Sequence, residues 1–131
     1  MATIRPFKGF RPTPELCSKV AALPYDVMTS KEAREMVKND PYSFLHVDRA
    51  EIDLPENVDI YSKEVYEKAA SNLNKMIEDK VLIQDSKPVF YIYSLTMNGR
   101  EQIGLVVCTS IDEYLNNTIK KHEFTRADKE Q

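Results

Sequence analysis

One stretch of the chain constrains its fold more than any other. It consists of two runs rich in β-forming residues, VFYIYSLTM and REQIGLVVCTS, joined at Asn98-Gly99. Asn-Gly is the preferred pair where both central residues of a two-residue turn take positive φ, as in a type I′ hairpin. The sequence therefore predicts an antiparallel β-hairpin with strands at about 89–97 and 100–108.

Alternation along the first of these strands divides its side chains between the two faces of the sheet. One face carries Phe90, Ile92, Ser94 and Thr96. The other face is almost wholly apolar or aromatic, with Val89, Tyr91, Tyr93, Leu95 and Met97. Such a face has to be covered, and we expect the longest predicted helix to cover it.

Apolar residues recur at helical spacing from Tyr61 to Ile77, which predicts that longest helix at about 60–79. Three shorter helices are predicted from caps, a proline at a first turn and apolar spacing, at about 14–21, 30–39 and 111–119. Either Thr29 or Ser30 caps the second of these, and either Ser110 or Asp112 caps the last.

Short strands are predicted in the first dozen residues and in two apolar runs, SFLHV (43–47) and VLIQD (81–85). The acidic run DRAEIDLPENVD breaks any periodicity and is interpreted as a surface loop. The elements together predict an α+β domain, an antiparallel sheet built round the hairpin and packed by helices. The length of 131 residues and the 42% of hydrophobic residues suit one domain with a core of its own.

Charge and composition exclude some classes of function. A net charge of −3 argues against general binding of nucleic acid or anionic membranes, because both partners require a basic surface. No apolar run approaches the roughly 20 residues of a membrane span, and the first residues lack a secretory signal, so we expect a cytoplasmic protein. The two cysteines form no metal or redox spacing and are predicted to be buried or half-buried thiols.

The segment KHEFTRADKE near the end of the chain concentrates chemistry that could bind phosphate. Lysine supplies a point charge, arginine a two-pronged donor and threonine a hydroxyl, so Lys121, Thr125 and Arg126 could converge on one phosphate with His122. Glu123 could hold a cation or orient His122, which can carry a proton at neutral pH. The alternative is a solvated tail whose positive charges follow the end of a helix.

Two further sites are candidates. Asp26, in the loop PYDV, could be a base, a cation ligand or the residue that fixes the turn. Arg5, Lys8 and Arg11 form a basic cluster with Phe7 and Phe10 between them, and Gly9 would let a ligand approach the backbone. We interpret this cluster first as an ordinary edge strand. If it is functional, phosphate capture is preferred over the binding of single-stranded nucleic acid.

The two histidines lie too far apart in the sequence to indicate a metal site, and no metal is expected. His46, within SFLHV, is interpreted as a packed or hydrogen-bonded structural residue. No phosphate-binding glycine loop, dinucleotide fingerprint, nucleophile elbow or zinc-protease motif occurs.

Several segments in the same order carry a family resemblance: FKGFRP, LPYDVMTSKEA, NDPYSFLHVDRAEIDLP, the tyrosine-rich hairpin ending near GLVV, and IKKHEFTRADKEQ. Together they resemble the prokaryotic family catalogued as domain of unknown function 1015. Members of that family are longer and carry a later Gly-His-His-Arg motif that this sequence lacks. The resemblance therefore implies that the chain is the N-terminal part of a longer protein, with the remaining domain as a partner.

The resemblance also implies a class of ligand. A distant relationship is argued between this family and the ParB and sulfiredoxin superfamily, which includes nucleotide-using proteins. It thus implies part of a binding site for a nucleotide, with Mg²⁺, or for another phosphorylated small molecule. The rival hypothesis is a non-catalytic interaction or regulatory domain, which an exposed apolar patch would favour.

Overall fold

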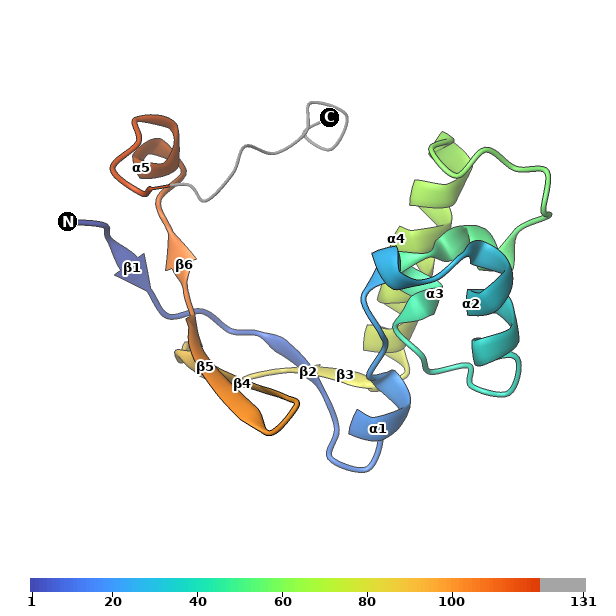
Figure 1. Ribbon diagram of the computed structural model, residues 1–131, viewed down its shortest axis with the longest axis horizontal. Coiled ribbons are helices and arrows are strands. Elements are labelled where there is room, and N and C mark those ends of the chain that lie inside the picture. The colour runs from blue at the N-terminus through green and yellow to red at the C-terminus, as the bar shows by residue number, and fades with distance from the viewer. Residues whose placement is uncertain (121–131) are drawn as a thin grey trace. The chain divides into compact units, whose positions relative to one another are not determined.

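The computed structural model describes residues 1–120, which form two compact units (Figure 1). We call residues 10–84 the helical unit, and residues 1–9 together with 85–120 the hairpin unit. Both units combine helices with two-stranded antiparallel sheets, which confirms the predicted α+β class. That the two units act as a single domain stays a prediction. No helix among the described residues is long and apolar enough to cross a membrane.

The helical unit contains one small sheet, in which β2 (Phe10–Pro12) pairs with β3 (Leu82–Gln84). Its α-helices are α1 (Cys17–Val20), α2 (Ser30–Val37), α3 (Leu45–Asp48) and α4 (Lys63–Glu78). Two 3-10 helices complete it, η1 (Tyr25–Val27) and η2 (Ala50–Asp53). The three helices that the sequence predicts in this unit, α1, α2 and α4, are all shorter than expected. Helices α1 and α4 lose residues at both ends, and α2 loses them at its C-terminal end.

A capping box explains where α2 begins. The Thr29 hydroxyl accepts a hydrogen bond from the backbone nitrogen of Glu32, and the Glu32 carboxylate accepts one from the backbone nitrogen of Thr29. Two donors that the first turn of a helix leaves free are satisfied in this way. Of the two predicted caps, Thr29 is therefore the one that acts.

The buried core of the described residues lies in the helical unit and has two parts. The first centres on Val20, Met76, Val81 and Leu82, with Phe44 and Leu73 packed against it. The second part contains Ala33, Val37, Leu45 and Ile52. Helix α4 packs against α3, η2 and β3 (Figure 1), so its apolar stripe is covered within this unit.

In the hairpin unit, β4 (Tyr91–Met97) and β5 (Arg100–Val106) form the predicted hairpin. Asn98 and Gly99 have φ of 52° and 76°, as a type I′ turn requires. A second pair joins β1 (Ile4–Arg5) to β6 (Cys108–Thr109), and α5 (Ile111–Leu115) follows. The Ser110 hydroxyl caps α5 by accepting from the backbone nitrogen of Glu113.

Three predictions about local structure are wrong. The run SFLHV is not a strand, because its hydrogen bonds are local: the backbone nitrogens of Val47 and Asp48 both donate to the carbonyl of Phe44, as in a helix. The predicted loop after it contains η2, whose Ile52 is buried because it packs into the second part of the core. Both cysteines are exposed, since neither core cluster reaches α1's Cys17 or β6's Cys108.

Candidate functional site

The residues predicted from the sequence fall into three groups. Arg5 and Lys8 belong to the hairpin unit, and Arg11 and Asp26 to the helical unit, all with exposed side chains. The other five lie outside the described residues: Lys121, His122, Glu123, Thr125 and Arg126. That these nine residues contribute to a phosphate or ligand site stays a prediction.

Arg5 lines a hollow of about 430 Å³ together with Thr3, Cys108, Thr109, Ser110 and Glu113. Glu113 already accepts hydrogen bonds from the backbone nitrogen of Thr3 at 2.6 Å and from its hydroxyl at 2.7 Å. The backbone hydrogen bond from Thr3 is the largest cause that holds the pKa of Glu113 below its usual value. The ionised carboxylate of Glu113 in this wall offsets part of the positive charge of Arg5.

Arg49, not Asp26, fixes the PYDV loop. Its Nε donates to the carbonyl of Tyr25 at 3.0 Å, and its Nη2 donates to the carbonyl of Met28 at 2.5 Å. The exposed carboxylate of Asp26 makes no hydrogen bond to residues 1–120. Turn fixing, which is the commonest use of a loop aspartate, is therefore carried out here by an arginine 23 positions further along the chain.

Arg49 also belongs to a buried charged cluster. Its Nη1 lies 2.7 Å from Oε1 of Glu51, which also accepts from the Ser30 hydroxyl at 2.8 Å. Burial acts to raise the pKa of Glu51. The hydrogen bonds from Ser30 and Arg49, a backbone hydrogen bond and the charge of Arg49 act against burial, and the pKa is lowered overall. The carboxylate is therefore ionised and paired, as a buried charge has to be.

Arg34 completes this cluster from α2. Its guanidinium donates to the carbonyls of Glu51, Ile52 and Leu54 at 2.5–2.7 Å. A hollow of about 370 Å³ opens beside it, between α2 and the segment that follows η2. Because most donors of Arg34 and Arg49 bind the protein itself, we interpret this cluster as structural.

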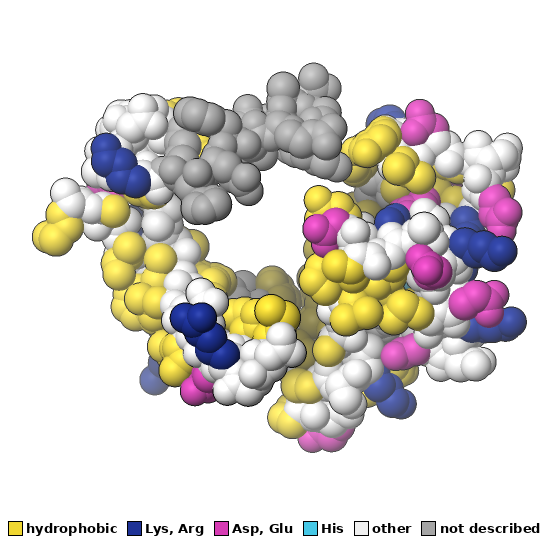
Figure 2. Space-filling model, viewed as in Figure 1, with side chains coloured by type: hydrophobic (Ala, Val, Ile, Leu, Met, Phe, Trp, Pro, Cys, Tyr) yellow, Lys and Arg dark blue, Asp and Glu magenta, His cyan; other side chains and the backbone are white. Residues whose placement is uncertain are grey.

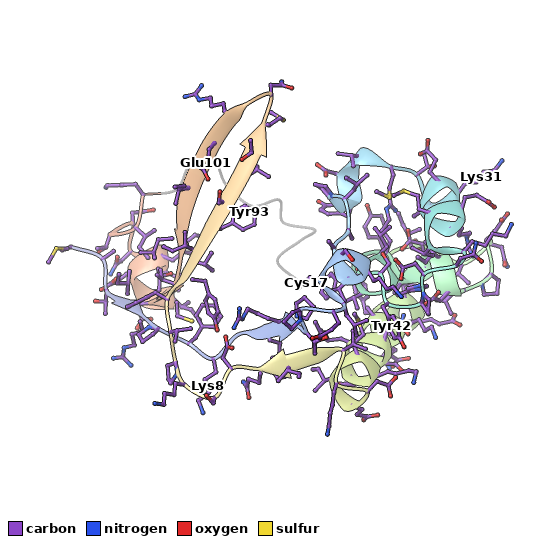
Figure 3. The ribbon with its side chains drawn as sticks, turned by 90° about the horizontal axis from the view of Figure 1, so that it is seen from below. Lys8, Cys17, Lys31, Tyr42, Tyr93 and Glu101 are labelled. Atoms are coloured by element: carbon purple, nitrogen blue, oxygen red, sulfur yellow. The ribbon has the colours of Figure 1, made fainter. Side chains whose placement is uncertain are left out.

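A larger hollow, of about 620 Å³, lies along one face of α4. The helix contributes Lys68, Asn72, Lys75 and Asp79, residues that lie three or four positions apart and so share a face. Tyr42 lies against α4 (Figure 3), and the apolar part of the wall comes from Pro41, Met76 and Val81. Polar and apolar groups thus meet in one concave surface, which is typical of small-molecule sites.

His46 and Asp53 also line this hollow, at a point where hydrogen bonds join α3, η2 and α4. The Nδ1 atom of His46, on α3, lies 2.8 Å from Oδ1 of Asp53, on η2. The amide of Asn72, on α4, donates to Oδ2 of Asp53 at 2.8 Å and to the carbonyl of His46 at 2.6 Å. The structural interpretation of His46 therefore holds, and Asn72 fixes the Asp53 carboxylate in place.

The lysines of the hollow differ in their partners. Lys75 lies 2.7 Å from Oδ2 of Asp79, and this hydrogen bond is the largest cause that raises the pKa of Lys75. Lys68 is half-buried and makes no ion pair with residues 1–120. The hydroxyl of Tyr42 likewise makes no hydrogen bond within that part of the chain. An ammonium group and a hydroxyl group are thus open to a ligand.

The sequence did not indicate this site. The helical spacing shows only which residues of α4 face the core, and it suggests no partner for His46. A signal was present in the spacing of Lys68, Asn72, Lys75 and Asp79 along one helix face. The contribution of His46 and Asp53 could not be read in this way, because α3 and η2 were not predicted.

No group of three or more His, Cys, Asp or Glu side chains able to hold a metal ion occurs within residues 1–120. The fold is that of an α+β protein with small antiparallel sheets and a polar hollow along its longest helix. The chain belongs to the family described as protein of unknown function (DUF1015), whose model matches residues 4–131. No curated protein and no solved structure matches the chain significantly.

Proposed function

We propose that the chain binds a small phosphorylated molecule in the hollow beside α4. The observation that carries the proposal is Lys68, an ammonium group in a concave wall without a carboxylate partner among residues 1–120. An anion is the group that such a cation binds best, and hydrogen bonds between charged groups are stronger than neutral ones.

The dimensions of the hollow suit a ligand with more than one polar group. Lys68 and Lys75 are separated by two helical turns, which is about 10 Å along the helix axis. The hydroxyl of Tyr42 is a further donor group in the same wall. A phosphate on Lys68 could belong to a ligand that extends toward Tyr42.

The apolar part of the wall suits the rest of a nucleotide. The ring of Tyr42 offers a flat surface for a base, and Met76 and Val81 extend that surface. A nucleotide with Mg²⁺ is accordingly the preferred ligand class. The residues that the sequence predicts for such a ligand, among them Arg5, Arg11 and His122, remain a separate proposal for the same ligand class. We also propose that the protein is cytoplasmic and prokaryotic.

Titration calorimetry of the chain with ATP, CTP and ribose 5-phosphate, each with and without Mg²⁺, tests the proposal. Lys68→Ala should weaken the binding of any responding ligand by about tenfold to a hundredfold, the loss of one charge-assisted hydrogen bond. Lys63→Ala is the matched control, because Lys63 lies on the same helix outside the hollow, paired with Glu67. No heat with any ligand, or an equal loss in the control variant, would overturn the proposal.

A second candidate function is that of an interaction domain. It is favoured by the apolar side chains that the hairpin exposes, including Ile92, Tyr93 and Met97, which are 69%, 59% and 70% exposed. Exposed apolar surface of this kind is typical of places where another polypeptide binds.

A further inference from the structure

The hairpin β4–β5 exposes apolar side chains on both of its faces. The register places Ile92, Ile103 and Leu105 on one face, and the other carries Tyr93, Leu95, Met97 and Val106. All seven are between 41% and 70% exposed. Figure 2 shows apolar side chains gathered over the hairpin. Summed over the two faces, they leave on the order of 700 Å² of apolar surface in water.

The register also determines which backbone groups of β4 are unpaired. In a two-residue hairpin the residues that flank the turn, here Met97 and Arg100, form a hydrogen-bonded pair, and such pairs alternate along the ladder. The backbone groups of Ile92, Ser94 and Thr96 therefore point away from β5. No other strand of residues 1–120 pairs with this edge.

Strand β4 lacks the features that normally protect a free edge. Proteins place lysine, proline, bulges or inward charges on such strands to prevent pairing with another chain. The sequence YIYSLTM contains none of these residues and no charge, whereas β5 carries Arg100, Glu101 and Gly104. Of the two edges, β4 is therefore the one suited to accept a further strand.

We propose that two copies of the chain pair through β4, antiparallel and across a two-fold axis at Ser94, to give a four-stranded sheet. A second copy is the occupant that the sequence of β4 fits best. In this register Ser94 lies opposite its own copy, Ile92 opposite Thr96, and Tyr93 opposite Leu95. Aromatic–aliphatic cross-strand pairs are favourable, and no like charges meet.

The number of strands in the hairpin sheet supports pairing with a second copy, which would add two strands. An isolated two-stranded hairpin is at best marginally stable, whereas a sheet of three or more strands is independently stable. Pairing through β4 therefore stabilises the hairpin and extends its apolar faces across the axis.

Disulfide cross-linking of the chain tests the inference without reference to the hollow beside α4. The exposed Cys17 and Cys108 are first replaced by serine. In that background, Ser94→Cys should form an intermolecular disulfide on mild oxidation, because hydrogen-bonded antiparallel pairs hold their Cα atoms about 5.5 Å apart. Ile103→Cys is the matched control. Ile103 lies directly opposite Ser94 on the same face, but on the outer strand, where the two copies would be about 14 Å apart.

Sedimentation equilibrium gives the second readout. We expect a monomer–dimer equilibrium for the unmodified chain, and a shift to monomer for Ser94→Lys, which places two lysines opposite each other at the axis. Ile103→Lys should leave the dimer intact, and circular dichroism of each variant reports whether it folds. A monomer at every concentration, or equal cross-linking of the Ser94→Cys and Ile103→Cys variants, would overturn the inference.

Discussion

The hydroxyl of Tyr91 lies 2.6 Å from the backbone nitrogen of Gly9, and it accepts the hydrogen bond that this nitrogen donates. The same hydroxyl donates to the Asp85 carboxylate, at 2.5 Å. The Tyr91 ring also packs on Phe7, with ring centroids 5.0 Å apart. The sequence predicts that Gly9 lets a ligand approach the backbone. Among the described residues, the Tyr91 hydroxyl binds its nitrogen and the backbone nitrogen of Asp85 donates to its carbonyl at 3.0 Å.

Gly9→Ala should destabilise the hairpin unit for this reason. A Cβ atom at position 9 would lie 2.7 Å from the Tyr91 hydroxyl oxygen and 2.9 Å from the ring carbon that bears it. We expect a loss of about 1–3 kcal/mol, the usual cost of overpacking, measured by urea unfolding. Gly104→Ala is the control, because its Cβ would meet no atom closer than 3.9 Å. Equal stability of the two variants would contradict the prediction.

Removal of Arg49 should destabilise the helical unit. Arg49→Met leaves the Glu51 carboxylate, only 9% exposed, without its cation. Loss of one partner of a buried pair costs about 3–5 kcal/mol, whereas replacing both costs much less. We therefore expect Arg49→Met with Glu51→Gln to be more stable than Arg49→Met alone in thermal unfolding. A double variant as unstable as the single one would count against this account.

The same carboxylate gives the helical unit a pH dependence. The folded-state pKa of Glu51 is lowered, so its contribution to stability is present above the unfolded pKa and is lost as the pH falls through the folded value. The acid side of the stability profile should therefore flatten in the Arg49→Met, Glu51→Gln variant. Denaturant unfolding over a pH series measures this, and an unchanged profile would refute it.

Asn72→Asp should be destabilising at neutral pH. The new carboxylate would replace an amide that donates to Asp53 at 2.8 Å, so two negative charges would stand at hydrogen-bond distance. The loss should shrink as the pH falls toward about 4, where carboxylates begin to take up protons. Asn74→Asp, at an exposed position of the same helix, should show neither effect in thermal unfolding. A pH-independent loss would mean that lost packing, and not repulsion, is the cause.

Local signals in the sequence were sufficient for the hairpin and for α4. Asn98-Gly99 specifies its turn because few other residue pairs take positive φ at both positions. The apolar spacing of α4 extends over several turns, so its period is unambiguous. The capping contact between Thr29 and Glu32 is likewise one between near neighbours, and Thr29 is one of the two caps that the sequence predicts.

Short apolar runs were not sufficient. SFLHV is too short to show a period, and its helical form depends on Leu45 packing into the second part of the core, where it is 1% exposed. The prediction that both cysteines are buried or half-buried is wrong for a similar reason. A thiol can pack in a core, but contacts between elements distant in the sequence decide which residues the core contains.

The sequence by itself determined the α+β class, the hairpin and its register, and the long helix, because each depends on neighbouring residues. Only the tertiary structure decided that His46, Asp53 and Lys68 line one hollow, since α3, η2 and α4 must pack before these side chains share a wall. It also decided that the Gly9 backbone meets the Tyr91 hydroxyl, a contact between residues 82 positions apart.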